Sequence, residues 1–450
     1  MLSGLGLPSS ARRQPFDEDV MVGPPGAERA QGRLRYSPAQ GLTLAVMGAD
    51  WLAGEQARQA WPSLQGESFA GVPLTLLGTS GREREFNDQR GRAEISAATL
   101  AVGTHVASPE KLQFGRLAFS LRGLREWLSG GWSRIEPNLN VGVSDPTVRI
   151  LNFKNGDADL QFVSEVQKSG GRYRSVEQRH ASVSITVSER LSLSQWRDRW
   201  ITPLRDLMIF ANRERSVLTN LSGYTEADTL HGAVRIFERQ ETAINTEDNF
   251  SFYQRDLLPA GIMDTATLIN AWVDLHSRLG ASTAFLFGTL NASQLPLENR
   301  FLNLMAFAEG YHRVMHDEQP LSSEAHAAYR EAMLSALPDD PQIRSLYDRD
   351  FAHSNRQSQR ERMDWLVSRA ETTDWASGLG DQIVASAVAT RNWLTHWGGK
   401  GKKVLENEHL ALLNRRLLFV IESNLLSDLG LDDAAVARCL ALGYVWDYPF

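Results

Sequence analysis

Cysteine is almost absent from this chain. Its 450 residues include one cysteine, Cys439, so no disulfide can form within the chain and no zinc site can draw two thiolates from it. Long apolar runs are also lacking, because the stretches 42–47 and 283–290 are far shorter than the roughly 20 residues of a membrane-spanning helix. The amino-terminal residues have no charged region ahead of an apolar run, as a secretory signal would. We therefore expect a cytoplasmic protein with no membrane partner.

Charge of one sign does not dominate either. Lys and Arg number 47 and Asp and Glu number 54, for a formal net charge of −7, and 42% of the residues are hydrophobic. That apolar share can form sizeable cores, which excludes disorder of the whole chain. The acidic balance argues against a protein that coats nucleic acid without specificity, but it allows a local basic patch. Neither a P-loop nor a Gly-x-Ser-x-Gly nucleophile elbow occurs.

The segment 17–200 alternates short apolar runs with turn residues. The alternation is clearest at 32–37, 41–46, 98–103 and 181–187. Its period of two predicts an antiparallel β domain. We expect two helical insertions, at 121–128 and at 192–211, with Ser192 as the N-cap of the second and Pro203 breaking or kinking it. Further strands are expected at 233–237 and 250–254.

The apolar spacing becomes helical after about residue 262. Helices are predicted at 265–279, 298–315, 323–337, 380–397 and 405–429, with a broken helix over 342–370. The fold class is therefore α+β, a β-rich N-terminal domain followed by an all-α bundle of about four to five helices. We place the β-rich domain at 1–262, a helical connector at 263–294 and the helical domain at 295–450.

The segment with the clearest chemistry is 389–399, Ala-Thr-Arg-Asn-Trp-Leu-Thr-His-Trp-Gly-Gly. Asn392 and His396 are one turn apart and share a helix face, while Arg391 lies about 140° around the helix from His396. The double glycine ends the helix, so His396 lies in its last turn, where the helix dipole favours a protonated imidazole. From spacing alone, a surface arginine and a locally bonded histidine remain the commoner explanation.

This segment resembles the Arg-x4–6-His motif of HEPN domains. Its fuller string, Thr-Arg-Asn followed by an aromatic residue, leucine and Thr-His, resembles the HEPN domain of ApeA-like anti-phage proteins. The helix 298–313 is similar to theirs, and the N-terminal half resembles the ApeA amino-terminal domain at 32–44, 124–127 and 193–196. Some members carry a cysteine-rich metal site, which a chain with Cys439 alone cannot form.

The resemblance implies a metal-independent endoribonuclease of anti-phage defence that needs no cofactor. Arg391, Asn392 and His396 would be the catalytic residues, and RNA, with tRNA as one candidate, would be cut by its own 2′-hydroxyl to leave 2′,3′-cyclic phosphate and 5′-hydroxyl ends. One histidine cannot act as base and acid in the same step, so a homodimer or higher even oligomer would supply two. An unknown phage trigger would act through the N-terminal domain.

Several residues allow two interpretations. The resemblance makes Glu309 a supporting partner of the active site, and an ordinary interhelix carboxylate explains it equally well. Lys400, Lys402 and Lys403 follow the motif and would either contact RNA phosphates or form a solvated basic loop. His312 and His316 have the spacing of two metal ligands on a helix, but a solvated helix face is favoured, so no metal site is predicted.

The apolar excess in 410–426 fits either a dimer surface or a core. Cys439 has apolar neighbours and is expected to be a buried thiol. A rival function also remains open: a non-catalytic HEPN scaffold whose β domain binds a phage protein or a glycan. An intact set of Arg391, Asn392 and His396 favours the enzyme.

Overall fold

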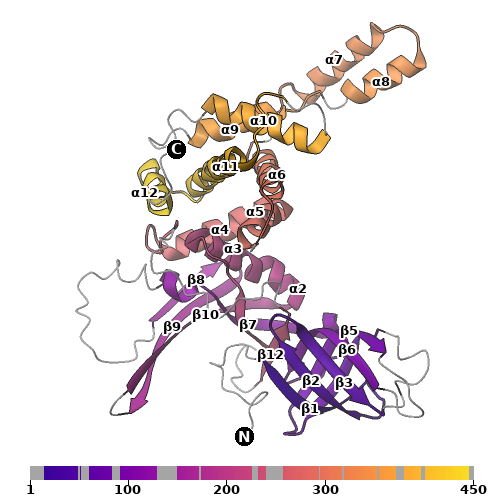
Figure 1. Cartoon of the computed structure of the whole chain (residues 1–450), viewed down its shortest axis with the longest axis vertical. Helices are drawn as coiled ribbons and strands as arrows, with labels where there is room; N and C mark the ends of the chain where they lie inside the picture. The colour runs from indigo at the N-terminus through magenta and orange to yellow at the C-terminus, as the bar shows by residue number, and fades with distance from the viewer. Residues whose placement is uncertain are drawn as a thin grey trace. The chain divides into compact units, whose positions relative to one another are not determined.

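The chain forms two compact units, Met1–Val273 and Asp274–Phe450, in a computed structural model (Figure 1). The structure describes residues 15–48, 51, 60–83, 92–128, 149–171, 174–225, 232–239, 257–292, 294–316, 319–351, 354–370, 380–396 and 401–444, and for 82–83, 92, 149, 165–171, 174–179, 380–381 and 444 the backbone alone. The first unit is β-rich and the second helical, so the predicted α+β class is confirmed. The division between the units falls inside the predicted connector 263–294.

Six antiparallel strands close into a barrel in the first unit (Figure 1). They are β1 (Phe16–Gly23), β2 (Ala30–Ser37), β3 (Gly41–Met47), β4 (Ser63–Ser68), β5 (Pro73–Glu83) and β6 (Arg92–Val102). Their order is β3-β2-β1-β4-β5-β6, and β3 pairs with β6 to complete the circle. Leu34 and Tyr36 of β2 are buried in the barrel core, whereas Arg33 and Arg35, which alternate with them, are exposed and pair with Asp17. The period-two pattern thus marks the inner and outer faces of the barrel.

Strand β6 belongs to the barrel and also begins a second sheet. Its residues 92–97 pair with β3, while 99–102 pair with β12 on the same edge. From there the sheet runs β12-β11-β7-β10-β9-β8. The strands are β7 (Gln113–Leu121), β8 (Arg149–Asn155), β9 (Ala158–Gly171), β10 (Arg174–Ser192), β11 (Leu218–Tyr224) and β12 (Ala233–Glu238). Strand β12 confirms the strand expected at 233–237, and the one expected at 250–254 lies outside the described residues.

The helix after β10 begins at the predicted cap. The Ser192 hydroxyl accepts from the Gln195 backbone N–H, and the Gln195 side chain accepts from the Ser192 N–H at 2.8 Å, which forms a capping box. Helix α2 (Leu193–Trp196) passes through a π-helical turn, Arg197–Ile201, into α3 (Thr202–Asn212). The helix therefore continues past Pro203, with the wider turn directly ahead of it, because proline has no N–H to continue the α-helical ladder. The shorter insertion is present as a helix over 124–128.

The remaining elements are helical. They are α4 (Thr265–Leu279), α5 (Thr283–Asn291), α6 (Leu297–Met315), α7 (Ser323–Ser335), α8 (Pro341–Phe351), α9 (Gln359–Ala370), α10 (Gly380–His396), α11 (Asn407–Asp428) and α12 (Asp433–Tyr444). Helix α4 has its predicted bounds, and the predicted break of 342–370 separates α8 from α9. Seven helices, α6 to α12, follow residue 294 in the described part of the chain, so the expected number of four to five was too low. Helices α5 and α12 were not predicted.

Helix α11 is the centre of the helical unit. It packs against α6, α9, α10 and α12, and it is buried on several sides, for example at Leu413, Leu417 and Phe419. The apolar excess of 410–426 is therefore the core of this unit. Cys439 on α12 is fully buried, as expected. None of the described helices combines the length and the apolar character needed to cross a membrane.

Gly66 of β4 leaves no room for a side chain. A Cβ there would lie 2.2 Å from the Met21 carbonyl oxygen on β1, and a backbone atom in a barrel cannot move away cheaply. We expect Gly66→Ala to destabilise the first unit by about 2 kcal/mol or more, measured by calorimetric unfolding of the full chain. Gly115→Ala in β7 is the matched control, because its nearest neighbour is 4.0 Å away. Equal melting of both variants would contradict this account.

Candidate active site

Helix α10 carries the Arg-Asn-x3-His segment at the point where it leaves the core. Ile383, Val384 and Ala387 bury one face of the helix, which packs against α6, α9 and α11. Arg391 is half-buried, while Asn392 and His396 are exposed. His396 is the last residue of α10 that the structure describes, and the glycines expected to end the helix lie outside the described residues. The buried residues of α10 thus hold it in the core, while Asn392 and His396 are exposed near its described end.

Thr390 fixes the position of the basic segment that follows the helix. Its side chain is fully buried, and its hydroxyl oxygen accepts a hydrogen bond from the Leu405 backbone N–H at 3.0 Å. This bond brings residues 401–405 back to α10. Lys402 and Lys403 are exposed in that segment, and Lys400 lies outside the described residues. The sequence alone assigned no role to Thr390. The signal that could have identified it is a polar residue on the apolar face of the helix.

Arg391 is paired with Glu309. Its Nη2 lies 3.7 Å from the Glu309 Oε1, and the two side chains are 30% and 22% exposed. The same Glu309 oxygen accepts a hydrogen bond from Gln359 Nε2 at 2.9 Å. One carboxylate of α6 therefore joins α9 and α10. The structure thus brings together two of the residues that the sequence singled out, and it adds Gln359, for which the sequence offers no recognisable pattern.

Asn392 lies beside this pair. Its Oδ1 is 3.5 Å from Arg391 Nη1, at the long limit of a hydrogen bond. Thr395 lies between Asn392 and His396 in the sequence. Its hydroxyl donates a hydrogen bond to the Arg391 backbone carbonyl at 2.9 Å, so this side chain is bonded within the helix. The Asn392 amide and the His396 ring both remain exposed. The arrangement supplies a permanently charged fork and an accessible proton-exchanging ring on one helix end.

Two family models match the chain. Residues 302–435 match the model described as Apea-like HEPN, and residues 21–260 match ApeA N-terminal domain 1. This chain belongs to the ApeA family. The family has a nuclease-type role in anti-phage defence, and its HEPN domains are related to ribonucleases. No curated protein and no solved structure matches the chain.

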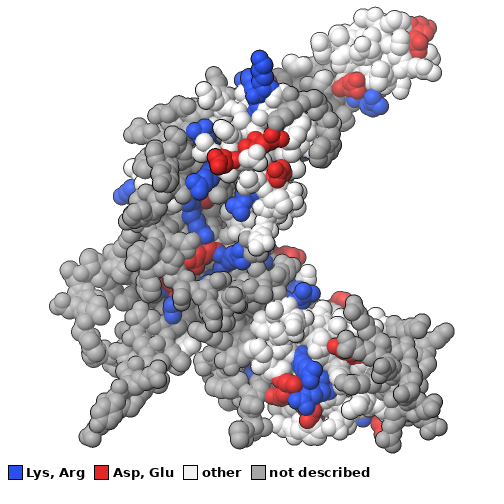
Figure 2. Space-filling model, in the orientation of Figure 1, with Lys and Arg blue, Asp and Glu red and all other residues white. Residues whose placement is uncertain are grey.

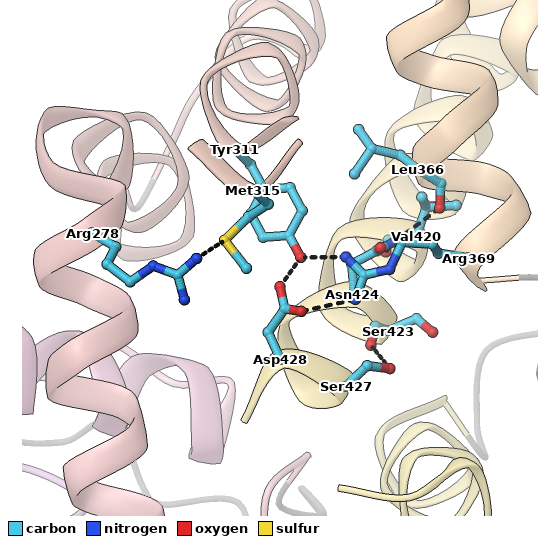
Figure 3. A network of polar contacts seen from close by, with 10 residues as sticks. All are labelled: Arg278, Tyr311, Met315, Leu366, Arg369, Val420, Ser423, Asn424, Ser427 and Asp428. Carbon is cyan, nitrogen blue, oxygen red and sulfur yellow. Dashed lines mark hydrogen bonds and ion pairs between the residues drawn. The ribbon is translucent and has the colours of Figure 1, made fainter. Parts of the chain in front are cut away.

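A buried polar network ties three helices of the HEPN unit together (Figure 3). The Tyr311 hydroxyl on α6 donates to the Asp428 carboxylate on α11. Arg369 on α9 donates to the same carboxylate at 2.8 Å and to the Tyr311 oxygen at 3.2 Å. Burial raises the pKa of Tyr311, and the charge of Asp428 raises it further, so the phenol stays protonated.

His312 and His316 form a ring cluster with Trp365 of α9. The His316 ring stacks on Trp365 at 5.0 Å, and the His312 ring meets Trp365 edge-on at 5.1 Å. His312 is only 2% exposed, so the expectation that this histidine pair lies on a solvated helix face was wrong for His312. The reason is that α9 covers this face of α6. Within the described ranges, no three His, Cys, Asp or Glu side chains gather as a metal site would require.

The N-terminal unit has an open groove of its own. It has a volume of about 540 Å³ on the sheet of β7, β8, β9 and β10. Its lining mixes the apolar side chains of Phe153 and Leu160 with polar and charged ones, namely Arg116, Asn152, Lys154, Asp159, Gln161, Ser184 and Thr186. The Arg116 guanidinium lies over the Tyr224 ring, 4.0 Å from its centre, which holds the arginine in place. The groove offers hydrogen-bond donors and acceptors to a ligand.

We expect Asp428→Asn to destabilise the HEPN unit by about 1–3 kcal/mol, because it removes the charge that Arg369 and Tyr311 share in a mostly buried place. The control is Asp364→Asn, which removes the exposed 3.7 Å pair with Arg360 and should change stability by less than about 0.5 kcal/mol. Urea unfolding of the full-length chain measures both. A loss at Asp364 as large as that at Asp428 would refute the network's role.

Proposed function

We propose that this ApeA-family protein is a metal-independent endoribonuclease of anti-phage defence, with Arg391, Asn392 and His396 as its catalytic residues. The observation that carries the proposal is the pairing of Arg391 with Glu309 at the exposed end of the helix that also carries His396. The contact at 3.7 Å orients the guanidinium but is loose. Most of the five N–H donors of the guanidinium therefore remain for a phosphate.

The reaction is a transfer of a phosphoryl linkage within the RNA. The ribose 2′-oxygen attacks the neighbouring phosphorus and gives its proton to a base, while the bond from phosphorus to the 5′-oxygen breaks and that oxygen takes a proton from an acid. The products are a 2′,3′-cyclic phosphate and a 5′-hydroxyl end. Arg391 neutralises the charge that grows on the phosphate oxygens. His396 transfers the protons, and Asn392 orients the ring or a phosphate oxygen.

A single chain supplies one imidazole for two simultaneous proton transfers. A two-fold dimer that brings the exposed ends of two α10 helices together supplies two His396 and two Arg391 to one cleft. The exposure of His396 and Asn392 in the single chain fits a surface that is completed by a partner. A homodimer, or a higher even oligomer, is therefore the active form.

The N-terminal unit restrains the nuclease until a phage component reaches it. The groove beside Arg116 is its concave site for such a trigger. The cleaved RNA would be host or phage RNA, with tRNA as one target, in the cytoplasm. The rival function is a HEPN scaffold without catalysis whose β unit binds a phage protein or a glycan, and the same groove is the feature that favours it.

Substituting His396 separates these functions. We expect the wild-type chain to cut RNA in the presence of a chelator and to leave cyclic phosphate ends, detected by sequencing RNA after selective capture of those ends. His396→Ala should reduce cleavage at least about a hundredfold, because it removes both base and acid. Phage protection and toxicity on overexpression should fall with it. If the variant protects and poisons cells as wild type does, the scaffold function is correct.

Mixing wild-type and His396→Ala chains tests the composite site. A cleft that needs one His396 from each chain is lost in every mixed dimer, so activity at constant total protein should fall roughly with the square of the wild-type fraction after exchange. With equal amounts of the two chains, about a quarter of the activity should remain. Sites confined to single chains predict a loss in proportion to the wild-type fraction, with about half of the activity remaining. The measurement is chelator-resistant cleavage before and after exchange.

A further inference from the structure

Arg362 of α9 is a buried cation without an adequate anion. Its side chain is 9% exposed, and its Nε has no hydrogen-bond partner among the residues that the structure describes. A charged group taken out of water is normally paired and fully hydrogen-bonded, because desolvation is costly. An unpaired nitrogen in a guanidinium at this depth therefore points to a missing partner.

The positive charges of two further arginines act on the Arg362 guanidinium. Arg313 follows Glu309 by one helical turn on α6, and Arg356 lies just ahead of α9. Both are exposed. Burial lowers the pKa of Arg362, the positive charges of Arg313 and Arg356 lower it further, and the Glu309 carboxylate opposes them. The contact of Gln359 with Glu309 brings the two helix faces together, because Arg362 follows Gln359 by about one turn on α9 and Arg313 follows Glu309 by about one turn on α6.

The other carboxylates of α9 are engaged elsewhere. Glu361 accepts from the Ser358 backbone N–H at 2.6 Å at the start of the helix, and Asp364 pairs with Arg360 at 3.7 Å. Glu309 itself is already bound by Gln359 and Arg391. On the face drawn in Figure 2, basic and acidic side chains are interspersed and form no continuous basic surface.

We propose that Arg313, Arg356 and Arg362 form a subsite for a backbone phosphate of the RNA, next to the phosphate held by Arg391. The planar fork of arginine matches phosphate oxygens, and a phosphate supplies the negative charge that the cluster lacks. Glu309 separates and orients the two arginine groups. The assignment of RNA as ligand rests on the proposed function, but binding at this subsite does not require cleavage.

The test measures RNA binding by a variant in which cleavage is removed. In a full-length His396→Ala background, the affinity for a single-stranded RNA oligonucleotide is measured by fluorescence anisotropy over a series of salt concentrations. Arg313→Gln and Arg356→Gln should each weaken binding by about three- to tenfold and reduce the slope of log affinity against log salt by about 0.7. Both side chains are exposed, so the variants fold, and thermal melting verifies this. Arg362→Gln should weaken binding further.

Arg360→Gln is the matched control. Arg360 is an exposed arginine of the same helix, paired with Asp364, and its removal takes the same charge from the chain without touching the cluster. The control should leave affinity and salt slope unchanged. The inference is overturned if Arg313→Gln/Arg356→Gln binds RNA with the parent's affinity and slope, if Arg360→Gln weakens binding equally, or if the parent does not bind RNA. A mononucleotide that binds as tightly as the oligonucleotide would also overturn it, because the ligand is then a free phosphate compound.

The outcomes separate this inference from the nuclease proposal. Cluster-dependent RNA binding without chelator-resistant cleavage by wild type would keep the subsite and refute the nuclease. Cleavage that depends on His396, together with RNA binding that is indifferent to the cluster, would keep the nuclease and refute the subsite.

Discussion

The Glu309 carboxylate is the contact on which the arrangement of α6, α9 and α10 around the motif depends. It accepts a hydrogen bond from Gln359 of α9 and pairs with Arg391 of α10, so it links the guanidinium of the motif to both neighbouring helices. A second contact between helices, that of Tyr311 with Arg369 and Asp428, ties α6 to α9 and α11. A charge-assisted contact in a partly dry place holds geometry better than an exposed one, because water competes less for both partners.

The distribution of charge in the molecule favours a local binding site over attraction by the whole chain. A chain with a net charge of −7 does not attract RNA through its overall field. Under the proposed function, recognition of RNA must then come from local excesses of positive charge such as the cluster of Arg313, Arg356 and Arg362. Local recognition of this kind would suit the proposed nuclease, which must ignore most cellular RNA until it is triggered. The closed barrel and its attached sheet form a separate unit, to which we propose that the trigger binds.

Some elements could be predicted from local sequence because their causes are local. Ser192 caps its helix with Gln195 three residues later, and the apolar spacing of α4 reproduces its bounds. Other features escaped prediction. The apolar run of α5 shows no helical period, and His312 is buried by Trp365, a residue of another helix. The sharing of β6 between barrel and second sheet depends on which edges pair, and strand pattern alone does not carry that information.

The sequence by itself determined the α+β class and the order of the two parts. It also determined that the arginine, asparagine and histidine of the motif lie on one helix of an ApeA-family chain. Both follow from the sequence because periodicity and motif spacing are properties of neighbouring residues. Only the tertiary structure decided that Glu309 meets Arg391, that Thr390 anchors the segment with Lys402 and Lys403, and that Arg362 is buried beside other arginines. These contacts join residues far apart in the chain, and packing of α6, α9 and α10 around α11 brings them together.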